Sequence, residues 1–175
     1  MIFVTVGSQL PFDRLVRAVD EWCSIRQTGD VFGQIADPGP GGYRPRNFAW
    51  ERFLHPEEYD RHFRAADLIV AHAGMGSIIM ALMSGKPIVV MPRQASLMEH
   101  RNDHQQATAR KFSGKPNLFI VNSDIDLADA IDIALTQPQT KPSDVKVLAD
   151  RSLIDALRRF ITSPANDPKE CERSE

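Results

Sequence analysis

The chain has 175 residues, of which 42% are hydrophobic and 25% charged, with a formal net charge of −2 at pH 7. This composition is that of an ordinary globular domain, excludes a disordered or fibrous chain, and gives no reason to expect a nucleic-acid partner. Two cysteines, Cys23 and Cys171, are too few for a disulfide framework and favour a reducing compartment. No apolar run reaches the ~20 residues of a membrane-spanning helix and no signal peptide precedes the first strand, so we expect a cytoplasmic protein.

Strand and helix patterns alternate from the start of the chain. Residues 2–6 are β-branched and apolar, which predicts a strand, and Gly7 and Ser8 close it. Apolar residues at three- and four-residue spacing predict a helix over 12–25. Further patterns predict a weaker strand at 31–36, a mobile glycine- and proline-rich loop at 37–46, a strand at 48–54, and a helix at 56–66 with acidic residues in its first turn.

The stretch from 67 to 92, DLIVAHAGMGSIIMALMSGKPIVVMP, dominates the middle of the chain. Residues 68–71 form a continuous apolar run, which predicts a parallel strand covered on both faces. Residues 78–83 are apolar nearly all round, which predicts a buried helix. Gly85 should end this helix and Pro87 should open the next strand.

The turn inside this stretch has the features of an anion site. Gly74 and Gly76 let the backbone turn sharply and approach a ligand without a Cβ in the way. Ser77 falls at the predicted helix start, where its hydroxyl and the free N–H groups can receive a phosphate. The alternative is a simple tight turn, because the third glycine of the GxGxxG fingerprint is missing.

The remaining patterns complete an α/β arrangement. A polar loop at 93–100, a helix at 102–112 and a strand at 118–121 follow, and Ser123 with Asp126 approximates a capping box for a helix to about Thr136. An apolar stripe predicts an amphipathic helix at about 144–161, and the polar residues 163–175 read as a disordered tail, which leaves one domain over 1–162. The alternation predicts a mainly parallel sheet with ligands at the carboxyl ends of its strands.

Two groups of polar side chains should meet at that edge. His72 ends a buried strand, and it is either a satisfied core histidine or, beside the glycine turn, a hydrogen-bond donor to a phosphate. His100 and His104 are spaced for a metal, but the pattern is not HExxH, and Gln105 and Gln106 suit hydroxyl-rich ligands such as sugars. We therefore expect no metal site. The alternative for this second group is a polar helix start on a solvated face.

The ordered motifs resemble a known family. His-Ala-Gly-Met-Gly-Ser at 72–77, then Gly-Lys-Pro, Val-Met-Pro and Asp-His-Gln-Gln at 103–106, are similar to the nucleotide-sugar-binding half of inverting GT-B glycosyltransferases of family 28. The opening Val-Thr-Val-Gly-Ser and Phe-Asp-Arg-Leu at 12–15 are similar too, and the likeness covers residues 1 to about 136. It extends to the short catalytic subunits of two-component UDP-sugar transferases: the eukaryotic subunit that adds the second GlcNAc to dolichol diphosphate, and bacterial exopolysaccharide counterparts.

The resemblance implies a fold and a set of contacts. The fold would be one half of a GT-B enzyme, a Rossmann-like sheet with helices on both faces. A diphosphate would be held by His72, Gly74, Gly76 and Ser77, with Gly7 and Ser8 near the phosphates, and the donor sugar by Asp103, Gln105 and Gln106, with His104 a further candidate. The glutamate that binds ribose in the family is replaced by Met80.

The resemblance also implies an activity: transfer of a sugar from a UDP-sugar to a polyprenyl-diphosphate-linked saccharide, without a cofactor or an obligatory metal. The acceptor half would come from a membrane-anchored partner, which would hold this chain at the inner face of the membrane, with the helix at about 144–161 as a docking surface. Asp13 and His72 are weak candidates for the catalytic base, because the attacking side faces the partner. The alternatives are a non-catalytic nucleotide-sugar-binding regulatory module, which the Met80 departure keeps open, and a dinucleotide-dependent oxidoreductase, which lacks its fingerprint.

Overall fold

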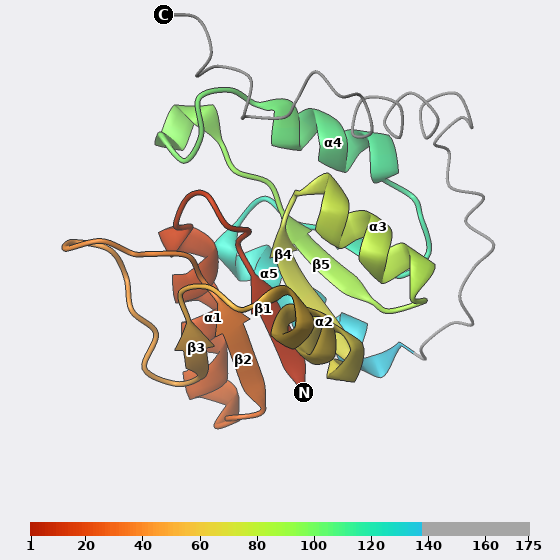
Figure 1. Ribbon diagram of the computed structural model, residues 1–175. Coiled ribbons are helices and arrows are strands. Elements are labelled where there is room, and N and C mark those ends of the chain that lie inside the picture. Colours follow the sequence, from red (N-terminus) through yellow and green to blue (C-terminus); the bar gives the residue numbers. More distant parts are fainter. Residues whose placement is uncertain (138–175) are drawn as a thin grey trace, which may run out of the picture. The chain divides into compact units, whose positions relative to one another are not determined.

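A computed structural model describes residues 1–137 of the chain (Figure 1). The helix predicted at about 144–161 and the disordered tail predicted at 163–175 lie outside the described residues. These two assignments and the domain boundary at residue 162 therefore stay predictions.

A six-stranded, all-parallel sheet with the order β3-β2-β1-β4-β5-β6 forms the centre of the fold. The chain first runs outward from β1 to β3 and then returns to place β4 beside β1. The strand order therefore reverses between β1 and β4, and such a switch point is where doubly wound sheets bind ligands. The strands are β1 (Ile2–Thr5), β2 (Val31–Gln34), β3 (Ala49–Glu51), β4 (Leu68–His72), β5 (Ile88–Met91) and β6 (Leu118–Ile120).

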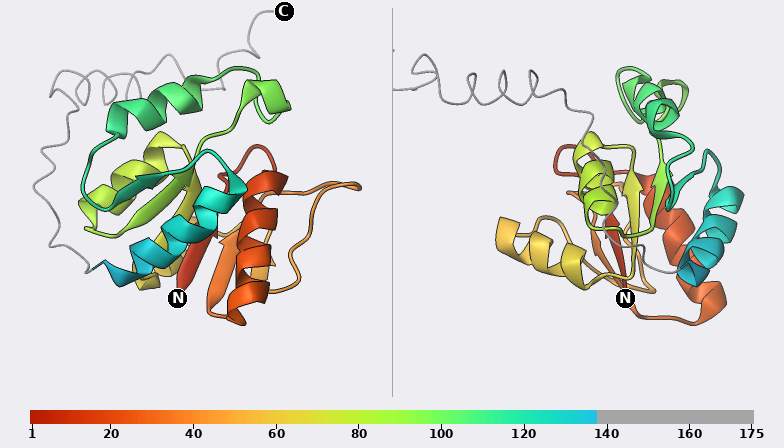
Figure 2. Two further views of the ribbon diagram at one scale, coloured as in Figure 1. Left: turned by 180° about the vertical axis from the view of Figure 1, so that it is seen from behind. Right: turned by 90° about the vertical axis from the view of Figure 1, so that its right-hand side faces the viewer.

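Helices cover both faces of this sheet, as predicted. Figure 2 shows α1 and α5 on one face and α2 and α3 on the other, with α4 near the carboxyl ends of the strands. The helices are α1 (Asp13–Arg26), α2 (Pro56–Ala65), α3 (Met75–Met83), α4 (His104–Phe112) and α5 (Asp124–Thr136), with a short 3₁₀ turn at Ala95–Leu97. The predicted α/β, Rossmann-like architecture is confirmed.

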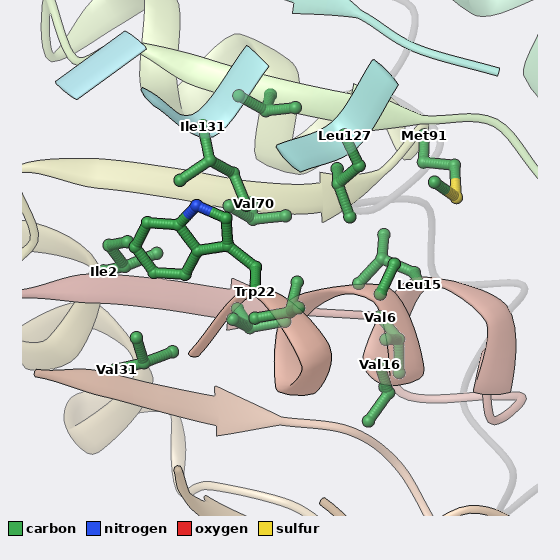
Figure 3. Packing of buried hydrophobic residues seen from close by; sticks show 14 of the residues in the cluster. Ile2, Val6, Leu15, Val16, Trp22, Val31, Val70, Met91, Leu127 and Ile131 are labelled. Carbon is green, nitrogen blue, oxygen red and sulfur yellow. The ribbon is translucent and has the colours of Figure 1, made fainter. Parts of the chain in front are cut away.

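The main core lies between the sheet and the α1/α5 layer (Figure 3). Trp22 of α1 is 5% exposed and packs in the same cluster as Val70 of β4 and Ile131 of α5. Its indole Nε1–H donates to Asp132 Oδ1 at 3.0 Å. Because this buried donor reaches its acceptor on α5, the two helices are held in a fixed register over the sheet.

Two helix ends follow the sequence rules that predicted them. The Ser123 hydroxyl caps α5 by accepting the Asp126 N–H at 3.2 Å. At the end of α3, Gly85 has φ +66°, and the Lys86 N–H donates to the Ala81 carbonyl at 2.9 Å. This is a Schellman motif, whose left-handed position favours glycine.

The start of α3 differs from its prediction. The helix begins at Met75, so Gly76 and Ser77 are its second and third residues, and Gly74 is the N-cap with φ −81° and ψ 131°. Neither Gly74 nor Gly76 has a positive φ. The expectation that these glycines form a sharp turn before a helix start at Ser77 is therefore wrong, because an N-cap needs only extended backbone and the first helical turn tolerates a glycine.

The burial predicted for α3 is also only partly correct. Ser77, Ile78, Ala81 and Leu82 are buried, but Met75 and Met83 are 52% and 53% exposed. Because α3 packs on one face of the sheet, one side of the helix remains open to solvent even though its residues are apolar.

Candidate functional site

A cleft of about 400 Å³ lies at the switch point of the sheet. The β1–β4 register pairs Thr5 with Ala71, so the segments that follow the two strands leave the sheet side by side. Residues from these segments and from the loop and helix after β5 line the cleft together. The predicted site residues among them are Gly7, Ser8, His72, Gly74, His104 and Gln105, whereas Gly76, Ser77, Asp103 and Gln106 lie outside the lining.

The His72 imidazole is flanked by two of the predicted glycines. A Cβ added to Gly74 would lie 2.4 Å from Nε2 of His72, and one added to Gly7 would lie 3.0 Å from its Cε1. Gly7 also has φ +83°, a left-handed conformation that favours glycine in its own right. By contrast, a Cβ on Gly76 would meet nothing within 4 Å. A side chain at position 74 would thus have to displace the His72 ring, whereas one at position 76 would not.

The His72 side chain lines the cleft and is electrically neutral at pH 7. Burial lowers its pKa to about 4, and the positive charge of Arg93 acts in the same direction. Its Nδ1 lies 3.5 Å from the Thr5 carbonyl oxygen. A histidine with this pKa carries one N–H and a weakly basic lone pair, which makes it a poor general base near neutral pH.

The positive end of α3 faces the cleft. Its N-cap, Gly74, has no side chain to bond the helix start, and Met75, the first helical residue, lines the cleft. In an α-helix the first N–H groups have no acceptor within the helix. These N–H groups and the helix dipole together suit an anion, although Ser77, in the third position, is only 9% exposed.

Arg93 organises the cleft, and the sequence analysis did not single it out. The side chain is 2% exposed, and its guanidinium donates to the carbonyl oxygens of Val6 at 3.2 Å, Leu10 at 2.7 Å and Pro11 at 2.6 Å. Burial lowers its pKa to about 10, so it stays charged at neutral pH. Arg93 thereby fixes the loop after β1 against the segment after β5. An arginine directly after the Val-Met-Pro strand end was the available signal.

A second arginine holds the same segments from the outer side. The Arg14 guanidinium donates to both carboxylate oxygens of Glu99, at 2.6 and 2.9 Å, and to the Pro92 carbonyl oxygen at 3.1 Å. Glu99 also accepts the Gln94 N–H at 2.9 Å. Bidentate pairing of this kind fixes geometry as well as charge. The loop that supplies the far wall of the cleft is therefore anchored to α1.

The residues predicted to contact the sugar do not all lie in the cleft. The Gln105 amide oxygen accepts the Arg93 N–H at 3.1 Å, so this 5%-exposed side chain shapes the wall of the cleft. Asp103 Oδ1 accepts the Ala95 N–H at 2.9 Å and lies 3.5 Å from Gln106 Nε2. His104 lines the cleft beside His100, with 4.4 Å between the two ring centroids.

Two other residues of the sequence analysis lie away from the cleft lining. Asp13 Oδ2 accepts the Tyr43 N–H at 3.0 Å and lines a neighbouring groove beside Arg14. Met80 is a partly buried residue in the middle of α3.

Within residues 1–137, no three His, Cys, Asp or Glu side chains converge as metal ligands. In the same part of the chain, no helix has both the length and the apolar character to cross a bilayer.

Sequence comparison relates this chain to glycosyltransferases. The glycosyltransferase family 28 C-terminal domain matches residues 1–155. The UDP-N-acetylglucosamine transferase subunit ALG13 of Homo sapiens is 30% identical over 125 residues, a match that covers 67% of this chain. The match covers 11% of the human protein, so this chain corresponds to about a tenth of that relative's length.

Solved structures show the same fold. The solution structure of ALG13 superposes with a TM-score of 0.58 and 22% identity, covering 90% of this chain and 96% of that one. The UDP-GlcNAc 2-epimerase of Methanocaldococcus jannaschii, solved in complex with UDP-GlcNAc and UDP, gives a TM-score of 0.58 and 11% identity, covering 90% of this chain and 45% of that one.

Proposed function

Because the chain belongs to the glycosyltransferase family 28 C-terminal domain family, we propose that it binds the sugar donor of a GT-B glycosyltransferase. The donor is a UDP-sugar, bound with its diphosphate at the start of α3 and its sugar toward His104. UDP-N-acetylglucosamine is the first candidate, because ALG13 of Homo sapiens is named a UDP-N-acetylglucosamine transferase subunit.

The observation that carries this proposal is the uncapped start of α3 beside His72. The cleft offers N–H donors and a helix dipole to an anion, while its buried arginine donates to carbonyl oxygens. Such preorganised dipoles can stabilise the charge that develops on a leaving diphosphate without a metal ion. In this arrangement Gly76 contributes a backbone N–H group, Ser77 contributes its backbone N–H and its hydroxyl, and Gly7 and Ser8 close the opposite side.

The proposed reaction needs a second protein. We infer that a membrane-anchored partner brings a polyprenyl-diphosphate-linked saccharide and the catalytic base, in the synthesis of an exopolysaccharide or a glycolipid. The pKa of about 4 disfavours His72 as that base, and Asp13 lies outside the cleft lining. The chain would then act in the cytoplasm at the inner face of the membrane, through its partner.

Calorimetric titration of the full chain with UDP, UDP-GlcNAc, UDP-glucose, UDP-glucuronate and NAD tests donor binding. Ser77→Ala is compared with Ser84→Ala, which changes the same side chain at the opposite, exposed end of α3. We expect a UDP-sugar to bind, Ser77→Ala to weaken binding about tenfold, and Ser84→Ala to leave it unchanged. Equal affinities for both variants would contradict a diphosphate at the start of α3.

A non-catalytic nucleotide-sugar-binding module is the second candidate, favoured by Met80 at the position of the family's ribose-binding glutamate. Turnover distinguishes it from the first. If the chain, reconstituted with its partner and a lipid-linked acceptor, transfers sugar from the bound donor, the chain is a catalytic subunit. If the chain binds the UDP-sugar but the chain and its partner together transfer no sugar, the chain is a non-catalytic regulatory module.

A further inference from the structure

A second cavity, of about 830 Å³, opens beside the loop that joins β2 to β3. We call it the arginine pocket. Its walls come from α1 and from residues 41–50, and none of the predicted site residues lines it. Three arginines and two aromatic rings distinguish its lining from that of the His72 cleft: Arg17, Arg44 and Arg46, with Tyr43 and Trp50.

The frame of this pocket is built around one buried carboxylate. Asp20 is 2% exposed, and its Oδ1 accepts the N–H groups of Arg46 at 3.0 Å and Asn47 at 2.7 Å. Its Oδ2 accepts the Tyr43 hydroxyl at 2.6 Å. Gly42 turns too close to Pro38 for any side chain, since an added Cβ would lie 1.8 Å from the Pro38 carbonyl oxygen. The loop is therefore fixed before any ligand arrives.

The arginines of the pocket outnumber its acidic residue by three to one. Within residues 1–137, none of the three pocket arginines forms an ion pair with a carboxylate, whereas Arg61 and Arg64 on α2 have carboxylate partners at 3.8 and 2.9 Å. Asp20 is the acidic residue of the lining, and its oxygens are already occupied by hydrogen-bond donors. A net positive, partly aromatic cavity remains.

The individual arginines have different tasks. Arg44 donates to the Gly39 carbonyl oxygen at 2.9 Å and so helps to fold the loop. The Arg17 guanidinium lies 4.3 Å from the centre of the Tyr43 ring, which orients it but leaves its N–H groups without an acceptor among the described residues. Arg46 engages Asp20 through its backbone, which leaves its side chain for the cavity. Arg17 and Arg46 both line the pocket together with Tyr43.

We propose that the arginine pocket binds a phosphate group through the guanidinium groups of Arg17 and Arg46. The planar, forked guanidinium matches phosphate oxygens, and two such groups with no acidic partner match a doubly charged anion. This site is separate from the His72 cleft and does not depend on the proposed function of that cleft.

The phosphate has two possible sources, a soluble phosphate compound or the headgroup of an anionic lipid. Arg17 also lines the adjoining groove with Leu97 and Met98, which are 51% and 93% exposed. Exposed apolar side chains beside arginine are the chemistry of a membrane-surface contact, so the lipid source is tested explicitly.

Trp50 supplies a reporter inside the pocket, since the other tryptophan, Trp22, lies in the core. The full chain is titrated with inorganic pyrophosphate, and separately with phosphatidylcholine vesicles with and without phosphatidylglycerol, while tryptophan fluorescence is recorded. The double variant Arg17→Gln/Arg46→Gln removes the proposed ligands. Arg61→Gln/Arg64→Gln removes the same charge from α2, where exposed ion pairs contribute little to stability.

We expect the Arg17/Arg46 variant to weaken binding about tenfold or more, and the Arg61/Arg64 variant to leave it unchanged. Binding of pyrophosphate identifies a soluble phosphate source, and binding only to phosphatidylglycerol vesicles identifies a lipid headgroup. The proposal is overturned if neither probe binds, if the Arg17/Arg46 variant binds like the wild type, or if both variants weaken binding equally. Thermal melting of each variant separates loss of a ligand from loss of the fold.

Discussion

The His72 cleft and the arginine pocket use the same side chain in opposite ways. In the cleft, Arg93 is buried and its N–H groups go to backbone carbonyl oxygens, so the surface left for a ligand consists of a neutral imidazole and a helix start. In the arginine pocket the buried charge is the carboxylate of Asp20, and the guanidinium groups remain exposed. Where the arginine itself is buried, it stabilises the fold. Where a carboxylate is buried in its place, the arginines stay at the surface and can contact a ligand.

The largest expected effect comes from replacing Arg93, which holds the segments of the cleft together. Arg93→Ala leaves the carbonyl oxygens of Val6, Leu10 and Pro11 without their shared donor, and we expect a loss of about 3–5 kcal/mol in the free energy of unfolding. Arg17→Ala, at the exposed site, should stay within about 0.5 kcal/mol of the wild type. Urea denaturation measures both. Similar losses for the two variants would show that burial of the arginine is not what separates the two regions.

The next effect is a pH dependence. The folded-state pKa of His72 is about 4, below its usual value of 6.5, so the unfolded chain binds more protons between these pH values. The contribution of His72 to stability is therefore present above pH 6.5 and is lost as the pH falls toward 4. We expect a decrease of about 2–3 kcal/mol between pH 7 and pH 4 that is absent in His72→Gln. Parallel pH profiles of the two proteins would refute the shift.

Alanine substitutions at Gly74 and Gly76 compare a position against the His72 ring with a position in open space. Gly74→Ala places a Cβ against the His72 ring and should cost about 2 kcal/mol of unfolding free energy, together with UDP affinity. Gly76→Ala meets open space in the first turn of α3 and should be neutral or stabilising by about 0.5–1 kcal/mol. Loss of UDP affinity in this stable variant would locate the ligand at Gly76 itself. Equal destabilisation by the two changes is the contrary result.

The smallest effect separates the cleft from the pocket. Asp13 holds the Tyr43 N–H, so Asp13→Ala should cost about 1 kcal/mol and weaken the fluorescence response of Trp50 to phosphate. UDP affinity should stay unchanged, because Asp13 does not line the cleft. A calorimetric titration that showed weaker UDP binding would place Asp13 in the donor site after all.

Local patterns predicted the elements of this fold, and long-range contacts decided the rest. The Ser123 cap and the Gly85 stop depend on neighbouring residues, so their residue types were sufficient. The position of the cleft was predicted, because the carboxyl ends of parallel strands meet at one edge of the sheet. The position of Arg93 directly after a strand end was a signal, but its role could not be derived from that position, because these acceptors are backbone carbonyl oxygens 82 to 87 residues away, which no residue type encodes.

The arginine pocket escaped the sequence analysis for a related reason. Residues 37–46 form a loop, as predicted, but a mobile loop was expected, and hydrogen bonds to Asp20, buried on α1, hold the end of this loop in place. A carboxylate within a helical pattern is usually read as part of the solvated face. Likewise, α3 starts earlier than predicted because glycines weigh against a helix in the sequence, while the first turn accepts them.

The flanking of His72 by Gly7 and Gly74 also dictates the order in which substitutions can accumulate. While the imidazole is in place, a side chain at position 74 must displace the His72 ring, and a smaller residue at position 72 removes that cost. A side chain at position 7 stays costly in either background, because its φ of +83° disfavours side chains whatever the space. For a lineage that changes both 72 and 74, changing 72 first is therefore the less costly order, so the effect of an alanine at position 74 depends on which residue already occupies position 72.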